Sequence, residues 1–434
     1  MNKKTYIRST FHYYRKDSNT EKISVLDKFI QSYGEAVKLY IDYIWDLKIE
    51  WKKGIIWDRE KDFLDCPSMI STTGLKYTGP LSGRALKCAA TQACGIVQAV
   101  VNKRKKDLNK LSWLKSKNKN PSKNLQKRVD RSLTKPECKF IECNLNSICM
   151  DIKPNDSKYF EGFIQLKSLW SVSSKYKKGL KIRIPFKHYR RSLKWKSKGT
   201  LLNSINLNEA RATLRWEVPK PELVKTGKTI AIDQGKIDCL TTSDKQMFKK
   251  DIHGHTLYSI IERLANKKWG SKNFWKIAEQ RKNYINWVVN QLNLTDVKEV
   301  KLEGIDNINY GRNVNRKLKH WTNTQIEGAL YKLLEEAGVL FTLEGSVFNS
   351  QRCNLCGWVQ KSNRKGKKFK CKKCGHEEDS DFNASQNILI RDTLFKLPFG
   401  FRSLRLNLRG FYWIPTGLFE EFGQELTVPV VPEN

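Results

Sequence analysis

The feature that most limits how this 434-residue chain can fold is a pair of Cys-x-x-Cys motifs in its C-terminal quarter. Cys353 and Cys356 form the first motif, Cys371 and Cys374 form the second, and fourteen residues separate the two. A glycine, Gly357 or Gly375, follows each motif and supplies the positive φ of a tight turn. One such pair alone also fits a redox site, but two pairs complete a tetrahedral sulfur shell that suits Zn²⁺. The sequence therefore predicts a zinc ribbon that binds one structural Zn²⁺.

Three carboxylates stand at the ends of predicted elements around this ribbon. Asp233 ends the apolar strand 229–232, Glu303 ends a strand in which Val300 and Leu302 alternate with a lysine, and Asp381 opens an apolar helical run. Each has a simpler interpretation on its own: a hairpin turn for Asp233, a solvated strand end for Glu303 and a helix N-cap for Asp381. Together they match the ribonuclease H arrangement, in which two neighbouring strands and a helix bring carboxylates to one point. Such a group holds two divalent ions for the attack of water on a phosphodiester.

The motifs around these residues resemble the TnpB family of transposon-encoded nucleases and its relatives, the compact type V CRISPR effectors and the Fanzor proteins. The segments IAIDQG, KLEG, FNSQRCNLCG, CKKCG and DFNASQNI carry the resemblance, which spans about residues 225 to 395. Gln234, Asn349 and Ser385 depart from the usual pattern, and none of them removes an expected ligand. The N-terminal half resembles the family in layout only.

The resemblance implies an RNA-guided DNA endonuclease. Asp233, Glu303 and Asp381 would be its catalytic residues and would hold two Mg²⁺, and the four cysteines would hold zinc. The partners would be a guide RNA and double-stranded target DNA, which is cut beside a short adjacent motif at one RuvC-like site. The protein would act as a monomer or an asymmetric homodimer. Two alternatives stay open: an RNA-guided repressor that does not cleave, and a protein-guided transposase or resolvase of the ribonuclease H type.

The charge of the chain points to a polyanionic partner. The sequence has 81 Lys and Arg against 44 Asp and Glu, which gives a net charge of +37. A membrane surface is the alternative, but no apolar run is long enough to span a bilayer and no signal peptide opens the chain. The seven cysteines outside the ribbon lack ligand spacing and are expected to be reduced. We therefore expect an intracellular protein, in the cytoplasm or nucleoid of a prokaryote or in a eukaryotic nucleus.

The order of predicted elements indicates a multidomain α+β chain. A basic, β-prone start is followed by long helical patterns and then by short alternating strands, which suggests an antiparallel barrel. In the resembled family this region is an oligonucleotide-binding-type wedge barrel with an inserted helical recognition lobe, followed by a ribonuclease H-like RuvC domain with an inserted zinc ribbon. The expected parts are wedge barrel 1–20 and 136–222, helical lobe 21–135, RuvC-like nuclease 223–343 and 380–395, zinc ribbon 344–379 and a tail 396–434.

The segment 185–199 is basic and contains interleaved aromatic residues. Such a mixture can stack on bases and neutralise phosphates, and a solvated basic loop with its aromatics in the core is the alternative. The residues expected to contact nucleic acid are Lys187, Tyr189, Arg190, Arg191, Lys194 and Trp195.

Overall fold

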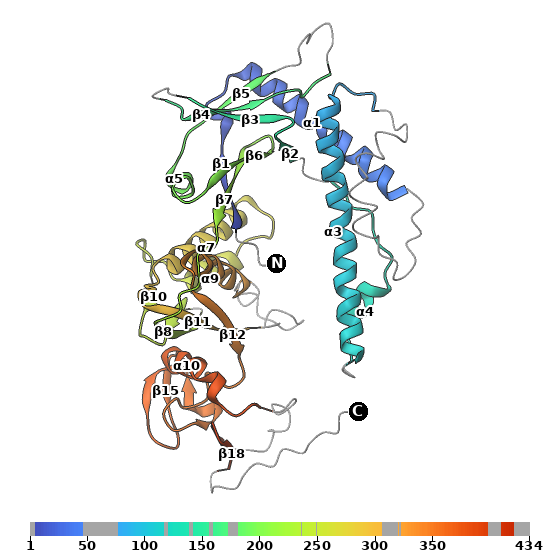
Figure 1. Ribbon diagram of the computed structural model, residues 1–434. Coiled ribbons are helices and arrows are strands. Elements are labelled where there is room, and N and C mark those ends of the chain that lie inside the picture. The colour runs from blue at the N-terminus through green and yellow to red at the C-terminus, as the bar shows by residue number, and fades with distance from the viewer. Residues whose placement is uncertain are drawn as a thin grey trace. The chain divides into compact units, whose positions relative to one another are not determined.

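The computed structural model describes residues 5–46, 77–116, 120–138, 142–155, 159–171, 181–235, 237–248, 250–305, 320, 323–397 and 409–420 (Figure 1). The chain divides into two compact units, Met1–Pro219 and Lys220–Val431, and each is described by itself. The fold is mixed α/β with several separate sheets. Of the predicted parts, the segment 47–76 of the helical lobe and the tail beyond residue 420 lie outside the described residues.

Two antiparallel sheets form the β-structure of the first unit. The larger sheet has the order β1-β7-β6-β2, and the smaller has the order β3-β4-β5. Their strands are β1 (Thr5–His12), β2 (Cys143–Asn146), β3 (Met150–Pro154), β4 (Gly162–Leu166), β5 (Ile182–Phe186), β6 (Thr200–Leu207) and β7 (Ala212–Pro219). Because β1 pairs with β7 along its whole length, the two ends of this unit's chain lie side by side.

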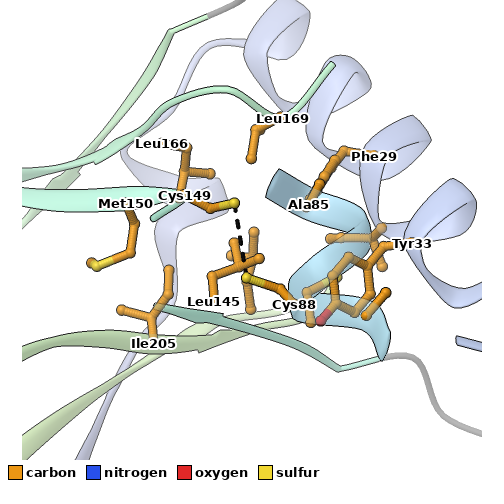
Figure 2. Close-up of a cluster of buried hydrophobic side chains, with 14 of the residues drawn as sticks. Phe29, Tyr33, Ala85, Cys88, Leu145, Cys149, Met150, Leu166, Leu169 and Ile205 are labelled. Carbon is orange, nitrogen blue, oxygen red and sulfur yellow. Dashed lines mark hydrogen bonds between the residues drawn. The ribbon is translucent and has the colours of Figure 1, made fainter. Parts of the chain in front are cut away.

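Helices complete the first unit: η1 (Tyr14–Lys16), α1 (Thr20–Asp46), α3 (Gly83–Ser116), α4 (Lys123–Asp130) and α5 (Arg190–Lys196). The apolar residues of α1 recur every three or four positions, and this stripe is buried against α3 and the sheets. Figure 2 shows Phe29 and Tyr33 of α1 beside Ala85 and Cys88 of α3. The Cys88 Sγ lies 3.9 Å from the Sγ of Cys149 in this core. These cysteines are free and buried, as expected for small apolar side chains.

A five-stranded sheet organises the second unit, with the order β10-β9-β8-β11-β12. The strands are β8 (Lys228–Asp233), β9 (Leu240–Thr242), β10 (Met247–Phe248), β11 (Val297–Gly304) and β12 (Leu340–Gly345). Strands β8, β11 and β12 are parallel, whereas β9 and β10 are antiparallel to their neighbours. The carboxyl ends of β8 and β11 therefore meet at one edge of the sheet.

The two faces of this sheet are covered by different helices. Ile230, Ile232, Val300 and Leu302 pack against α6 (Leu257–Ala265), α7 (Lys272–Asn290) and α9 (Asn323–Ala337). Side chains alternate between faces along a strand, so Lys301 points the other way. Its Nζ donates to the carbonyl of Leu389 in α10 (Ser380–Leu389) at 3.0 Å. Helix α10 therefore lies on the second face.

Two small sheets lie around the cysteine motifs. One has the order β14-β15-β16 and the other β13-β17-β18. The elements are β13 (Trp358–Val359), η2 (Lys361–Asn363), β14 (Arg364–Lys365), β15 (Lys368–Lys370), β16 (Glu377–Asp379), η3 (Arg391–Thr393), β17 (Phe411–Ile414) and β18 (Gly417–Phe419). Strands β17 and β18 come from the segment expected to be a tail, yet they complete the sheet of the first cysteine motif. Among the described residues, no helix has the length and apolar character needed to cross a bilayer.

Candidate metal-binding and acidic site

The four motif cysteines converge on one point. Their sulfur atoms all lie within 4.8 Å of one another. The Sγ atoms of Cys353 and Cys374 are 3.8 Å apart, and those of Cys356 and Cys371 are 3.6 Å apart. Four thiolates on a tetrahedral Zn²⁺, with bonds of about 2.3 Å, are separated by about 3.8 Å. The sulfur positions therefore fit a zinc ion, and no other residue is needed to complete the shell.

Helix α10 is tied to the first cysteine motif by two asparagines four residues apart. Asn383 donates to the carbonyl of Arg352 at 2.8 Å and accepts from the backbone N–H of Asn354 at 3.0 Å. Asn387 donates to the same carbonyl at 2.7 Å and accepts from Arg352 Nη1 at 2.7 Å. Because these side chains are buried, the hydrogen bonds hold the ribbon against α10, the helix that contains Asp381.

The three carboxylates singled out in the sequence lie on one face of the five-stranded sheet. Ile232 of β8 pairs with Leu302 of the adjacent parallel strand β11. Asp233 directly follows Ile232, and Glu303 directly follows Leu302. Side chains alternate between the two faces along each strand, so Asp233 and Glu303 point to the same face as Lys301, the face covered by α10. Asp381 is the second residue of that helix. The helix N-cap is Asp379, which accepts from the backbone N–H groups of residues 381 and 382, so the capping role considered for Asp381 belongs to its neighbour.

Burial and crowding control the ionisation of this group. Burial raises the pKa of Asp233 well above its usual value, and the nearby charges of Glu303 and Asp381 add to this shift. Burial likewise raises the pKa of Glu303 to about 7, although a hydrogen bond from Asn349 opposes the shift. Desolvated carboxylates of like charge resist ionisation unless a cation joins them. A bound divalent cation would favour the ionised form of these carboxylates.

Two amides position Glu303. The Nδ2 of Asn349 donates to Glu303 Oε1 at 3.1 Å and to the carbonyl of Gly345 at 2.8 Å. The Nε2 of Gln234, next to Asp233, donates to the carbonyl of Glu303 at 3.1 Å. Gln234 and Asn349 are two of the three departures from the family pattern, and both are buried beside the acidic group.

The hairpin between β14 and β15 places two cations on the third carboxylate. Arg364 Nη2 lies 3.0 Å from Asp381 Oδ1, and the Lys367 ammonium contacts both Asp381 and Asp238. The hairpin tip is docked on the start of α10, where the N–H of Ser380 donates to the carbonyl of Lys367 at 2.9 Å. Within the described part of the chain, only the cysteines bring three or more ligand atoms within 4.8 Å of one another. Asp381 is instead held by the hairpin cations.

The residues predicted to bind nucleic acid differ in their exposure to solvent. Lys187, Tyr189, Arg190, Arg191 and Lys194 are exposed on and before α5. Trp195 is only 2% exposed and packs with Trp216 and Val218. The expectation that Trp195 stacks on a base is therefore wrong in this structure, because the short helix turns its apolar side toward β7.

Sequence reasoning did not single out Arg364, Lys367 or Asp238 as site residues. The first two lie in a lysine-rich hairpin, and such runs usually remain solvated. Asp238 follows Asp233 by five residues and is 2% exposed. The sequence feature that could have indicated Asp238 is its place as a carboxylate beside an apolar strand.

Comparison with known proteins finds one family match, which lies in the second unit. Residues 325–388 match the family described as Cas12f1-like, TNB domain. A CRISPR-associated endodeoxyribonuclease Cas12f1 from Sulfoacidibacillus thermotolerans is 32% identical over 132 residues, which cover 30% of this chain and 29% of that protein. The Cas12f1 of Syntrophomonas palmitatica is 27% identical over 117 residues, 27% of this chain and 22% of that protein. The matched segments thus span less than a third of either relative.

Two solved structures resemble most of the chain at low identity. The Cas12f1–sgRNA–target DNA complex has a TM-score of 0.46 and 13% identity, and covers 86% of this chain and 83% of that one. CasPhi-2 (Cas12j) bound to crRNA has a TM-score of 0.49 and 10% identity, and covers 89% and 98%. The family match, residues 325–388, contains both cysteine motifs and the start of α10. The chain is therefore similar to Cas12f1 proteins over part of its length, and residues 325–388 match the Cas12f1-like TNB domain.

Proposed function

We propose that this protein is an RNA-guided DNA endonuclease that cuts target DNA beside a short adjacent motif. The observation that carries the proposal is the position of Asp233, Glu303 and Asp381 on one face of the sheet, where burial raises the pKa of Asp233 and of Glu303. The two Cas12f1 relatives are named endodeoxyribonucleases, which supports the same class of reaction.

The strand order supports a RuvC-like, ribonuclease H-type nuclease. Three parallel strands continue an antiparallel pair, and a helix on one face carries the third carboxylate in its first turn. We assign residues 223–343 and 380–395 to this domain and 344–379 to the zinc ribbon, extended by β17 and β18. In the first unit, we assign 1–20 and 136–222 to the wedge barrel and 21–135 to the helical recognition lobe. The interruption of its antiparallel strands by α1, α3 and α4 supports this division.

The acidic group would bind two Mg²⁺ through Asp233, Glu303 and Asp381. Such a metal pair would supply activation of a water molecule and stabilisation of the leaving oxygen of the phosphodiester. The protein's own part is to hold the carboxylates in place. Asn349 orients Glu303, the α10 N-terminus fixes Asp381, and the zinc ribbon carries Arg364 and Lys367 to the site, where they can neutralise phosphate.

The net charge of +37 supports simultaneous binding of guide RNA and double-stranded DNA, by a monomer or an asymmetric homodimer. Base pairing would then supply the sequence recognition. The test is to express the protein with its neighbouring genomic DNA, sequence the RNA that co-purifies, and replace its guide segment. Cleavage that follows the new guide supports the proposal. Cleavage without RNA would favour the protein-guided nuclease, and guided binding without cleavage would favour the repressor.

A further inference from the structure

An exposed cluster of aromatic rings lies at the connection between α6 and α7. Trp269 is 70% exposed and Trp275 is 55% exposed, although indole rings are mostly buried in folded proteins. Their centroids are 5.8 Å apart. Both rings contact Phe274, at 4.7 Å and 5.2 Å, and Phe274 is buried in the core of the second unit. The two tryptophans are thus fixed on a rigid base while they face solvent.

The backbone of this connection is ordered by short-range bonds. The Ser271 side chain caps α7 by accepting from the N–H of Phe274 at 3.1 Å. The N–H of Ser271 bonds to the carbonyl of Lys268 at 3.2 Å, and Gly270 has a φ of +78°. The turn therefore places Trp269 beside the first turn of α7. A preformed platform of this kind loses little conformational freedom when a flat ligand stacks on it.

The sequence around the rings is basic. Between Glu262 and Glu279 the sequence contains no acidic residue. It contains five basic ones: Arg263, Lys267, Lys268, Lys272 and Lys276. All five are exposed. Arg263, Lys267 and Lys276 also line a groove of about 1020 Å³ beside α6 and α7, which Asp251 and Glu279 line as well. We call the tryptophan pair, these basic residues and the groove the α6–α7 elbow.

We propose that the α6–α7 elbow binds an unpaired segment of RNA, with bases stacked on Trp269 and Trp275 and phosphates neutralised by the surrounding lysines. Exposed aromatic faces surrounded by basic side chains are features that hold single strands. A duplex does not fit this chemistry, because its bases already stack on one another. A hydrophobic protein partner is disfavoured by the five basic residues, and a second copy of this strongly basic chain would be repelled by them.

The assignment to RNA rather than DNA rests on the proposed function. A guide would be the permanently bound strand, and unpaired loops and bulges are the parts of an RNA that proteins recognise by stacking. The elbow is separate from the acidic site, since α6 and α7 cover the face of the sheet opposite α10. Its contribution would therefore be to hold RNA, and it would not take part in cleavage.

The first experiment maps contacts directly. Full-length protein, stripped of nucleic acid, is mixed with a single-stranded RNA of about 12 nucleotides that contains 5-iodouridine, in about 0.3 M salt to suppress purely ionic binding. After irradiation, the crosslinked peptides are identified by mass spectrometry. We expect crosslinks at Trp269 or Trp275. Crosslinks confined to other parts of the chain would overturn the proposal.

The second experiment measures affinity by fluorescence anisotropy. The double variant Trp269→Ala/Trp275→Ala should bind the single-stranded RNA about tenfold or more weakly, whereas Trp269→Phe/Trp275→Phe should keep most of the affinity. Tyr331→Ala is the matched control, because Tyr331 is 51% exposed on α9 of the same unit. Unchanged affinity in the folded alanine variant would contradict the proposal. Tighter binding of single-stranded DNA than of RNA, or loss of self-association in the variant, would also reject it.

The outcomes separate this inference from the proposed function. Binding and crosslinking need neither metal nor cleavage, so they can succeed where RNA-guided cutting fails. Conversely, guided cutting can be demonstrated in a protein whose RNA never contacts the elbow. Asp381→Ala, which removes a carboxylate of the acidic site, should leave RNA crosslinking at the elbow unchanged.

Discussion

Arg364 Nη2 lies 3.0 Å from Oδ1 of Asp381, so a guanidinium of the zinc ribbon forms an ion pair with the carboxylate in the first turn of α10. Lys367 binds the second oxygen of the same carboxylate and reaches Asp238 as well. Hydrogen bonds to Asp238 and Asp381 raise the pKa of Lys367 although its burial acts in the opposite direction, so the ammonium stays charged. The carboxylate that should bind a divalent ion is thus already paired.

The first prediction concerns this competition. Lys367→Gln should bind Mn²⁺ more tightly than the unchanged protein, by on the order of tenfold, because a charged hydrogen bond to Asp381 no longer has to be broken. Calorimetry on the protein without nucleic acid measures the affinity. Lys368→Gln, an exposed neighbour on the same hairpin, is the control and should have no effect. Equal or weaker ion binding by Lys367→Gln would show that Lys367 does not compete with the metal.

The second prediction concerns pH. Burial raises the pKa of Glu303 to about 7, and the hydrogen bond from Asn349 limits the rise. Between the ordinary glutamate pKa of about 4.3 and this value, the folded protein holds a proton that the unfolded chain has lost, so the metal-free protein loses stability as pH rises. Ion binding needs the ionised form, and the cleavage rate at limiting Mg²⁺ should therefore increase through pH 7.

Asn349→Ala should move the midpoint of that pH–rate profile upward by about one unit, because one hydrogen bond to a charged group is lost. Ser385→Ala is the control. Ser385 is also buried near the site, but its hydroxyl donates to the carbonyl of Phe382 and does not contact Glu303. A midpoint that stays in place in Asn349→Ala would mean that Asn349 does not influence the ionisation of Glu303.

The third prediction concerns zinc. The purified protein should contain about one Zn²⁺ per chain, and Cys353→Ser or Cys371→Ser should lose most of it. Because metal binding contributes folding free energy, these variants should also melt at a lower temperature. Cys239→Ser is the control, since Cys239 is buried in the same unit outside the cluster. Full stability without bound zinc would contradict a structural role for the ion.

The fourth prediction concerns the attachment of the ribbon. Asn387 exchanges two bonds with the buried Arg352, whose guanidinium also donates to the carbonyl of Trp413 at 2.8 Å. Asn387→Ala should lower the free energy of unfolding of the second unit by about 3 kcal/mol, because it leaves part of a buried cation without a partner. Asn387→Asp loses the donor to the carbonyls of Arg352 and Asn349, but it turns the acceptor for Arg352 Nη1 into a charged one, which should make it less damaging. Chemical denaturation measures both, and equal losses would argue against the bond to Arg352.

The sequence was informative where spacing and chemistry act together. The four cysteines were predicted from their spacing alone, and the structure brings their sulfurs together. The three carboxylates were predicted from their positions at element ends, and the structure places them on one face of the sheet. In both cases a local pattern determines where the side chains point. For Asp233 and Glu303, the parallel pairing of β8 and β11 then brings the two strand ends together.

Other features depend on tertiary contacts that no local pattern reveals. Trp195 lies in a basic segment, but the orientation of α5 buries it against Trp216. Strands β17 and β18 follow a stretch without clear periodicity, and they form only because β13 offers an edge. The hairpin cations reach Asp381 because Ser380 docks the hairpin tip. Each of these depends on a partner far away in the sequence.

The most direct test of the account is the rate of guided DNA cleavage under single-turnover conditions in Mg²⁺. Asp233→Ala, Glu303→Ala and Asp381→Ala should each lower the rate by about 1,000-fold or more while DNA binding persists, because each would remove a ligand of the proposed metal pair. Asp244→Ala, a carboxylate that pairs with Lys228 away from the site, should cut normally. Cutting at the normal rate by Asp381→Ala would contradict the claim that these three carboxylates form the catalytic site.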